Sequence, residues 1–384
     1  MTRKVCVVVT ARPSYSRVRS ALEAIVDHPG LELQLVVASS ALLDRYGSAV
    51  SQIEADGFHI DARVFTVVEG ETPTTMAKST GLGLLELATV LDGLEPDVVL
   101  SIADRHETIA TAVAAAYQNI PLAHLQGGEI TGSIDEKVRH AVTKLADLHL
   151  VSTELAAERV IRMGEDPATV HVTGCPSIDL AAGILDQPAL DFDPLERYGG
   201  VGDRLDLSDG YLVVMQHPVT TEYGQARHDV LETLHAVSDV GLPALWFWPN
   251  PDAGTDGTSN GIRSFREQEH PHRLHFFKNM APTDFLRLAY NSLGIVGNSS
   301  VAIRECSYLG IPAVNIGTRQ HGRERGANVV DVGYDRVAIA GAIRERTGSA
   351  RTPGDPLYGD GKAGVRIADL LAEVPLRTEK RLTY

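Results

Sequence analysis

The chain has 384 residues and a formal net charge of −15, from 35 Lys plus Arg and 50 Asp plus Glu. Hydrophobic residues make up 43 % and charged residues 22 %, a balance that excludes a disordered chain or a fibrous repeat. So acidic a chain is a poor candidate for nucleic-acid binding, which needs clustered cations. The length is about twice that of a typical domain and predicts two domains.

Cysteine usage and the first residues indicate the compartment. Cys6, Cys175 and Cys306 are far apart in sequence, so they predict neither a disulfide framework nor a Cys-type zinc site. The apolar run 5–9 is too short for a signal-peptide core or a membrane span. We therefore expect a cytoplasmic protein without a membrane partner. The histidines show no metal-ligand spacing, so we expect no metal.

Short β-branched runs alternate with amphipathic stretches along the first half of the chain. Helical periodicity is clearest in 16–26 and 136–146. Continuously apolar strands separated by helices are typical of parallel βαβ units with both sheet faces covered. The predicted strands of this half are 4–9, 32–38, 97–102, 122–125, 148–152 and 170–173.

The same alternation restarts after residues 183–210, which are rich in Asp, Gly and Pro and carry no period. We expect an α/β protein of two doubly wound, Rossmann-like domains that face a central cleft. The expected domains are 1–182 and 183–363, with an amphipathic C-terminal helix, 364–384, that packs back across them. The predicted strands of the second half are 211–215, 244–248, 274–277, 294–296, 313–316 and 329–332.

Open α/β sheets bind ligands at the carboxyl ends of their strands, and polar segments follow the first strands here. Arg12 and Ser16 lie in a strand-to-helix turn, which suits a phosphate or carboxylate; a solvent-facing Arg beside Pro13 is the alternative. No glycine fingerprint or Walker loop is present, so NAD and ATP chemistry are unsupported. Asp104 and Arg105 follow the third strand in a run of ionisable groups, which is costly unless it faces a polar cleft or open solvent.

The densest polar segment begins at Gln126 and includes Glu129 and Asp135. Its paired glycines allow close approach of the backbone to a ligand, and the carboxylates stand near the turn. Asp135 also suits the cap of the helix that follows, and capping is compatible with catalysis.

The second half offers a matching set of groups. His217 ends a buried strand, and Asn250 lies at the equivalent place after the next one. Ser299 and Ser300 precede a helix, whose N–H groups and dipole suit a diphosphate. The carboxylate of Glu305 suits vicinal hydroxyls such as those of a ribose; an N-capped helix with an exposed Glu is the plain alternative.

These motifs resemble the hydrolysing UDP-N-acetylglucosamine 2-epimerases of the sialic-acid-pathway type, nearly end to end. The resemblance implies a glycosyltransferase-B type fold, a homodimer or homotetramer, and no cofactor. It also implies anti elimination of UDP to a glycal, followed by hydration to free N-acetylmannosamine. The matching segments are ARPSYS, ADRHE, HLQGGEITGSIDEKVRHAVTKLADLHL, GCPSID, QHPVT, PNPDAG, GNSS with RE, and NIGTRQHGRERGANV.

The resemblance also implies residue roles. The catalytic set is Asp104, Glu129, Asp135, Gln126 and His217. The substrate-binding and UDP-binding set is Arg12, Ser16, Arg105, Asn250, Ser299, Ser300, Glu305 and Arg319.

Three positions depart from the family pattern. Gln126 stands where relatives have Glu or His, and an amide cannot transfer a proton, so either Glu129 takes that role or Gln126 only orients the substrate. Ser14 and Asn279 also depart, which leaves the sugar open. A UDP-diacetamido-trideoxyhexose substrate, a non-hydrolysing epimerase, a glycosyltransferase and a catalytically silent nucleotide-sugar sensor remain alternatives.

Overall fold

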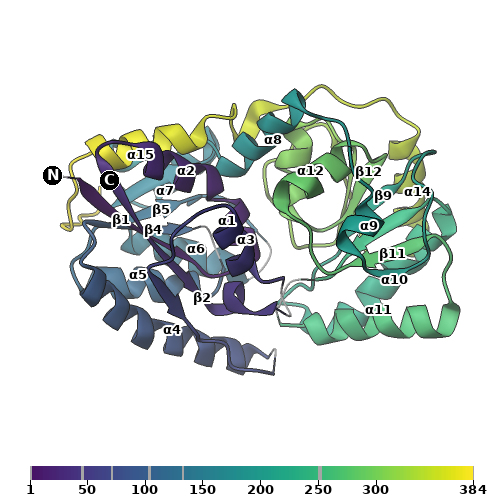
Figure 1. The fold of residues 1–384 in the computed structure, drawn as a ribbon, viewed down its shortest axis with the longest axis horizontal. Coiled ribbons are helices and arrows are strands. Elements are labelled where there is room, and N and C mark those ends of the chain that lie inside the picture. Colours follow the sequence, from purple (N-terminus) through teal and green to yellow (C-terminus); the bar gives the residue numbers. More distant parts are fainter. Residues whose placement is uncertain are drawn as a thin grey trace. The chain divides into compact units, whose positions relative to one another are not determined.

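A computed structural model describes residues 2–44, 47–70, 72–102, 105–131, 134–249 and 253–383. The chain forms two compact units (Figure 1). The first consists of Met1–Glu129, Ile134–Leu180 and Tyr358–Tyr384, and the second of Ile130–Ser133 and Ala181–Leu357. The sequence predicts that the first domain ends at residue 182 and the second at residue 363. In the structure, the chain passes from the first unit to the second after Leu180 and returns to the first after Leu357.

The described part of the first unit holds a seven-stranded parallel sheet in the order β3-β2-β1-β4-β5-β6-β7. The order reverses between β1 and β4, which is where doubly wound sheets bind their ligands. Its strands are β1 (Arg3–Val9), β2 (Leu31–Ala38), β3 (Ala62–Val64), β4 (Val98–Ile102), β5 (Leu122–Leu125), β6 (Leu148–Val151) and β7 (Val170–Val172).

Strand β1 supplies both faces of this sheet, because successive side chains point to opposite sides. Val7 joins the core that includes Leu22 of α2 and Ile367 of α15. Val8 joins the other core, with Leu87 of α4. Figure 1 shows α2 and α15 on one face and α4 and α5 on the other. The helices of this part are α1 (Arg12–Ser16), α2 (Arg19–Asp27), α3 (Ala49–Ala55), α4 (Pro73–Leu94), α5 (Thr108–Tyr117), α6 (Ile134–Leu145), α7 (Glu154–Arg162), α8 (Pro176–Asp186) and α15 (Ala363–Glu373).

The described part of the second unit repeats the architecture with the order β14-β13-β12-β9-β10-β11-β8. Its order reverses between β9 and β12. Its strands are β8 (Val201–Gly202), β9 (Leu212–Met215), β10 (Ala244–Phe247), β11 (Leu274–Phe277), β12 (Gly294–Gly297), β13 (Ala313–Ile316) and β14 (Val329–Val332). Its helices are α9 (Pro194–Tyr198), α10 (Ala226–Val240), α11 (Thr255–Glu269), α12 (Pro282–Tyr290), α13 (Glu305–Tyr308) and α14 (Arg336–Thr347).

The two sheets confirm the predicted α/β class with two Rossmann-like domains. Four local predictions need correction. Residues 183–210 are not only a linker, because they hold the end of α8, then α9 and the antiparallel edge strand β8. The helix predicted over 16–26 begins only at Arg19, as α2, because Ser16 ends the separate short helix α1. Strand β3 is an additional strand, and the helix predicted over 364–384 is shorter, since α15 ends at Glu373. In the part of the chain that the structure describes, no helix is long and apolar enough to cross a bilayer.

Candidate functional site

Strands β1, β4 and β5 are neighbours in the first sheet, so the segments that follow them meet at one edge. These segments carry Arg12 and Ser16, then Arg105, then Gln126 and Glu129. Two predicted site residues, Asp104 and Asn250, lie outside the described residues.

The turn after β5 is tightly constrained. Gln126 has a left-handed φ of +65° and Gly128 one of +75°, and a Cβ on Gly128 would run into the carbonyl group of Ala156. The Nε2 atom of Gln126 donates to Sγ of Cys175 at 2.8 Å. Its Oε1 atom is buried without a hydrogen-bond partner among the described residues, so an acceptor is held ready for a donor.

Glu129 ends this turn and is 2 % exposed. Its Oε1 atom accepts a hydrogen bond from Oγ of Ser152 at 3.1 Å, at the end of β6. Its backbone oxygen accepts one from Nη1 of the fully buried Arg139 at 2.8 Å. Ser152 therefore holds the carboxyl group of Glu129, and Arg139 holds its backbone.

Asp135 and Glu136 lie in the first turn of α6, where the helix dipole stabilises negative charge. Arg139 binds Glu136 at 2.8 Å with the same Nη1 atom that holds the carbonyl of Glu129. Arg139 thus ties the turn 126–129 to the first turn of α6, in which Asp135 lies.

Arg105 is buried and pairs with the carboxylate of Glu107 through two bonds, from Nε at 3.2 Å and from Nη2 at 3.0 Å. Burial alone would raise the pKa of Glu107, but Arg105 and His106 outweigh it and hold that pKa below its ordinary value. The guanidinium is therefore committed to an ion pair at the strand end.

Helix α1 begins at Arg12, as a strand-to-helix turn requires. Burial lowers the pKa of the half-buried Arg12 guanidinium to about 10, so the group is still charged at neutral pH. Ser16 donates its hydroxyl to the carbonyl of Pro13 at 3.1 Å. Tyr15 is buried and donates to the carboxylate of Asp56, which fixes α1 against the end of α3.

In the second unit, Asn298 links the ends of β9 and β12. Its Oδ1 atom accepts from the backbone N–H of His217, and its Nδ2 atom donates to the carbonyl of His217, both at 2.8 Å. Gly297, at φ +127°, allows this approach, since a Cβ there would meet the carbonyl of Met215. His217 is thereby held at the reversal point of the second sheet.

The predicted diphosphate and ribose residues follow β12 and β13. Ser299 caps a short 3₁₀ turn through the N–H of Val301, and Ser300 is the first residue of that turn. Glu305 begins α13, and its Oε2 atom is buried without a hydrogen-bond partner among the described residues. Arg319 donates to the carbonyl of Asn298 at 3.2 Å. An acceptor that lacks a donor at a ligand-binding edge fits a ligand hydroxyl.

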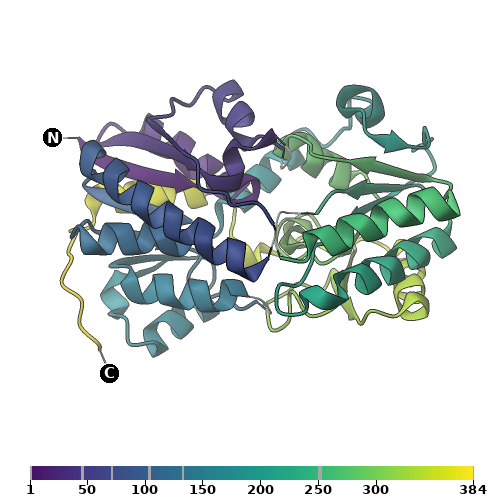
Figure 2. The ribbon, with the colours of Figure 1, turned by 90° about the horizontal axis from the view of Figure 1, so that it is seen from below.

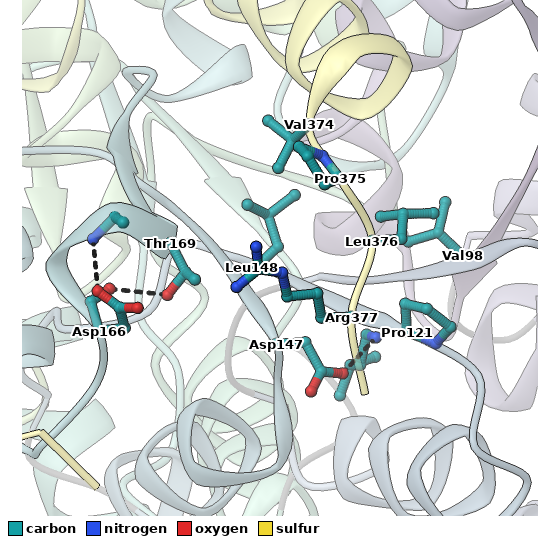
Figure 3. Close-up of a pocket in the computed structure, with 12 residues that line it drawn as sticks. Val98, Pro121, Asp147, Leu148, Asp166, Thr169, Val374, Pro375, Leu376 and Arg377 are labelled. Carbon is teal, nitrogen blue, oxygen red and sulfur yellow. Dashed lines mark hydrogen bonds between the residues drawn. The ribbon is translucent and has the colours of Figure 1, made fainter. Parts of the chain in front are cut away.

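The described cavities of the first unit lie at the opposite edge of its sheet. One of about 230 Å³ is lined at the starts of β4, β5 and β6 by Val98, Leu122 and Leu148, and by Val374 and Leu376 (Figure 3). A second, of about 380 Å³, adjoins it. Neither contains a predicted site residue. The described residues include no group of His, Cys, Asp and Glu side chains that would hold a metal ion.

Sequence reasoning missed the residues that hold the site together. Ser152, Arg139 and Asn298 act on groups 23, 10 and 81 residues away. For Asn298 a signal was available, since it follows the glycine that ends β12.

Comparisons with known proteins give the family. A model of the UDP-N-acetylglucosamine 2-epimerase family matches residues 23–372. The UDP-N,N'-diacetylbacillosamine 2-epimerase (hydrolyzing) of Legionella pneumophila is 32 % identical over 379 residues, which cover 99 % of this chain and 98 % of that protein. The UDP-N-acetylglucosamine 2-epimerase of Neisseria meningitidis is 28 % identical over 361 residues, covering 94 % and 92 %.

A solved structure gives the same fold. The crystal structure of UDP-GlcNAc 2-epimerase from Neisseria meningitidis bound to UDP-GlcNAc matches with a TM-score of 0.80 and 18 % identity, and the match covers 97 % of this chain and 100 % of that one. With the family model matched over most of its length, the chain belongs to the UDP-N-acetylglucosamine 2-epimerase family.

Proposed function

We propose that the protein is a hydrolysing UDP-sugar 2-epimerase that converts UDP-N-acetylglucosamine and water to N-acetylmannosamine and UDP. The observation that carries this proposal is the fixed pair of carboxyl segments in the first unit. Glu129 is held by Ser152, and Arg139 joins its turn to the helix start with Asp135.

The reaction needs proton transfer at carbon and a good leaving group. In the first step a carboxylate removes the C2 proton while the C1–oxygen bond to UDP breaks, which gives a glycal. In the second step water adds its oxygen at C1 and a proton returns to C2 on the opposite face. Positioned carboxyl groups perform such transfers, typically for a gain of about 10²–10⁴ in rate each. We assign them to Asp104, Glu129 and Asp135, with Gln126 as an orienting amide.

The second unit supplies the groups that would stabilise the departing UDP. Ser299 and Ser300 present a turn after β12, and Arg319 brings a cation beside it. Such donors stabilise developing negative charge on a diphosphate. We assign Glu305 to the ribose hydroxyls because its buried Oε2 atom has no donor among the residues that the structure describes, and His217 to the diphosphate or sugar.

A second candidate substrate has a specific observation in its favour. The Legionella relative, matched over 99 % of this chain, is named for UDP-N,N'-diacetylbacillosamine. The same elimination and hydration would then act on a sugar with a second acetamido group.

The test is an NMR time course in deuterated water, with UDP-N-acetylglucosamine and the UDP-diacetamido sugar in separate tubes. We expect free 2-epimer, UDP and one deuterium at product C2, and the ratio of the two kcat/KM values assigns the sugar. Accumulation of an epimerised UDP-sugar, or retention of the original C2 hydrogen, would refute the hydrolysing mechanism.

A further inference from the structure

The C-terminal tail, residues 375–383, runs along the first unit after α15 (Figure 2). Residues 377–383 are exposed, apart from the side chain of Lys380, which is half-buried. Where the tail leaves α15 it passes over the cavity of about 230 Å³, with Arg377 beside Leu148 and Asp147 and with Leu376 on the side of Val98 (Figure 3). Because hollows lie beneath it, polar anchors have to hold this segment in place.

Lys380 is the main anchor. Its side chain is 26 % exposed and forms an ion pair with Oε2 of Glu165 at 2.5 Å. Its Nζ atom also donates to the carbonyl of Thr143 at 3.2 Å and to the carbonyl of Ala146. Beyond it, Thr383 donates from its N–H to the carbonyl of Gly164 at 3.1 Å and from its hydroxyl to that of Glu165 at 3.0 Å.

The two carbonyls that Lys380 binds belong to the C-terminal end of α6. The last carbonyl groups of a helix lack partners within the helix and carry its negative dipole end, so an ammonium group there stabilises it. Lys144, in the last turn of α6, also binds Glu165, at 2.5 Å. Glu165 is 3 % exposed and therefore joins the tail to α6.

The opposite end of α6 carries Asp135, and Arg139 connects it to Glu129. Twelve residues at 1.5 Å each make α6 a rod of about 18 Å. In the last turn of α6, the end that Lys380 binds, Oγ1 of Thr143 lies 3.1 Å from Nδ1 of His124. His124 is on β5, the strand that leads into the turn 126–129. A change of position at the tail end of this rod therefore reaches the carboxyl groups.

We propose that the tail is a clamp for α6, and that Lys380 is a positioning residue for the carboxyl groups at the other end of the helix. The effect on turnover rests on the proposed function, whereas the effect on α6 does not. Lys380 touches no reacting atom, so its loss lowers kcat and leaves UDP affinity unchanged.

The test compares Lys380→Met with Arg381→Met. Arg381 is the neighbouring cation, its side chain is 86 % exposed, and it lies 3.7 Å from the equally exposed carboxylate of Glu379, so it is a matched control. In Lys380→Met we expect a kcat about tenfold lower at constant KM, since small misplacements of reacting groups are costly. We also expect faster amide hydrogen exchange in both the first and the last turn of α6. Arg381→Met should match the wild type in both measurements.

A lower melting temperature with normal kcat per folded molecule and normal exchange in the first turn of α6 would overturn the proposal. Lys380→Gln keeps a donor for the two carbonyls and carries the test if the Met variant does not fold. For Lys380→Gln, the proposal predicts a smaller decrease in kcat and a smaller increase in amide hydrogen exchange of α6. Wild-type values of both quantities in Lys380→Gln would overturn the proposal. If the wild type turns over neither sugar, the proposed function fails, and hydrogen exchange alone still decides whether the tail clamps α6.

Discussion

Glu129 lies at the end of a turn whose backbone conformation is tightly constrained. The left-handed Gln126 and Gly128 fix the backbone, and Ser152 fixes the carboxyl oxygen. A carboxyl group with a defined position and a buried environment is suited to proton transfer. The same geometry also suits a purely structural role, so the two roles have to be separated by measurement.

We predict that Glu129→Gln lowers turnover by about two to four orders of magnitude, the usual contribution of a positioned acid–base group. The amide oxygen can still accept from Ser152, so the turn should survive. Turnover per folded molecule and melting temperature are measured on the same sample, with Ser152→Ala as the control for the hydrogen bond. A stable, fully active Glu129→Gln protein would remove Glu129 from the catalytic assignment.

For Glu305 we predict that replacement by Gln weakens UDP binding by about 10- to 100-fold, because hydrogen bonds to charged groups contribute about 1.5–3 kcal/mol. Its buried Oε2 atom, which has no partner in the described part of the chain, is the acceptor that a ribose hydroxyl would use. Isothermal calorimetry with UDP measures the change. Glu267→Gln, on the exposed surface of α11, is the control. Equal UDP affinities in all three proteins would contradict the ribose assignment.

At the scale of elements, most strands were predictable because they are buried on both faces and read as continuous apolar runs; the partly exposed edge strands β7 and β14 are the exceptions. Strand β3 escapes this pattern, since it has three residues and Arg63 is exposed. The two-residue β8 contains a glycine and pairs antiparallel, so only its tertiary partner β11 defines it.

The segments of the candidate site were predictable from their place after strands, but their internal contacts were not. The position of a residue after a strand predicts that Glu129 and His217 lie at the carboxyl edges of their sheets. It does not predict that Ser152 binds Glu129 or that Asn298 binds His217, because those contacts join residues 23 and 81 positions apart. Lys380 at the end of α6 is more distant still, 234 residues from Ala146.

Two glycines of the first unit should respond to alanine in opposite directions. Gly128 has φ +75°, and a Cβ there would meet the carbonyl of Ala156, so Gly128→Ala should lower the melting temperature and abolish turnover. Gly81, inside α4, has open space around it, and Ala is favoured in helix interiors by roughly 0.5–1 kcal/mol. Calorimetric melting of both variants is the measurement. A Gly128→Ala protein as stable as the wild type would contradict the constrained turn.

For the molecule as a whole, the cluster around Glu165 joins β6, α6 and the C-terminal tail. Burial would raise the pKa of Glu165, but hydrogen bonds from His149, Lys144 and Lys380 outweigh it and lower that pKa to about 2. Burial also lowers the pKa of His149 and raises that of the neighbouring Asp147. The stability of the fold in acid therefore depends on several groups, whose pKa values folding shifts in different directions.

The last prediction isolates Glu165 within that cluster. A carboxyl group with a pKa of about 2 in the folded state and an ordinary 4.5 when unfolded binds fewer protons folded than unfolded between these values. Its contribution is full above the unfolded pKa, on the order of 3 kcal/mol, and is lost as pH falls through 4.5 toward 2. We compare His149→Gln with His149→Gln/Glu165→Gln, because Gln keeps a donor near the Nε2 position of His149 and removes the second titrating group. Asp147 is present in both proteins, so its contribution cancels in the comparison.

Calorimetry from pH 7 to pH 3 should show a steeper loss of melting temperature below pH 4.5 in the single variant than in the double variant. Parallel curves in that range would show that Glu165 titrates as it does in the unfolded chain, and the ion pairs with Lys144 and Lys380 would then contribute nothing to holding the tail on α6.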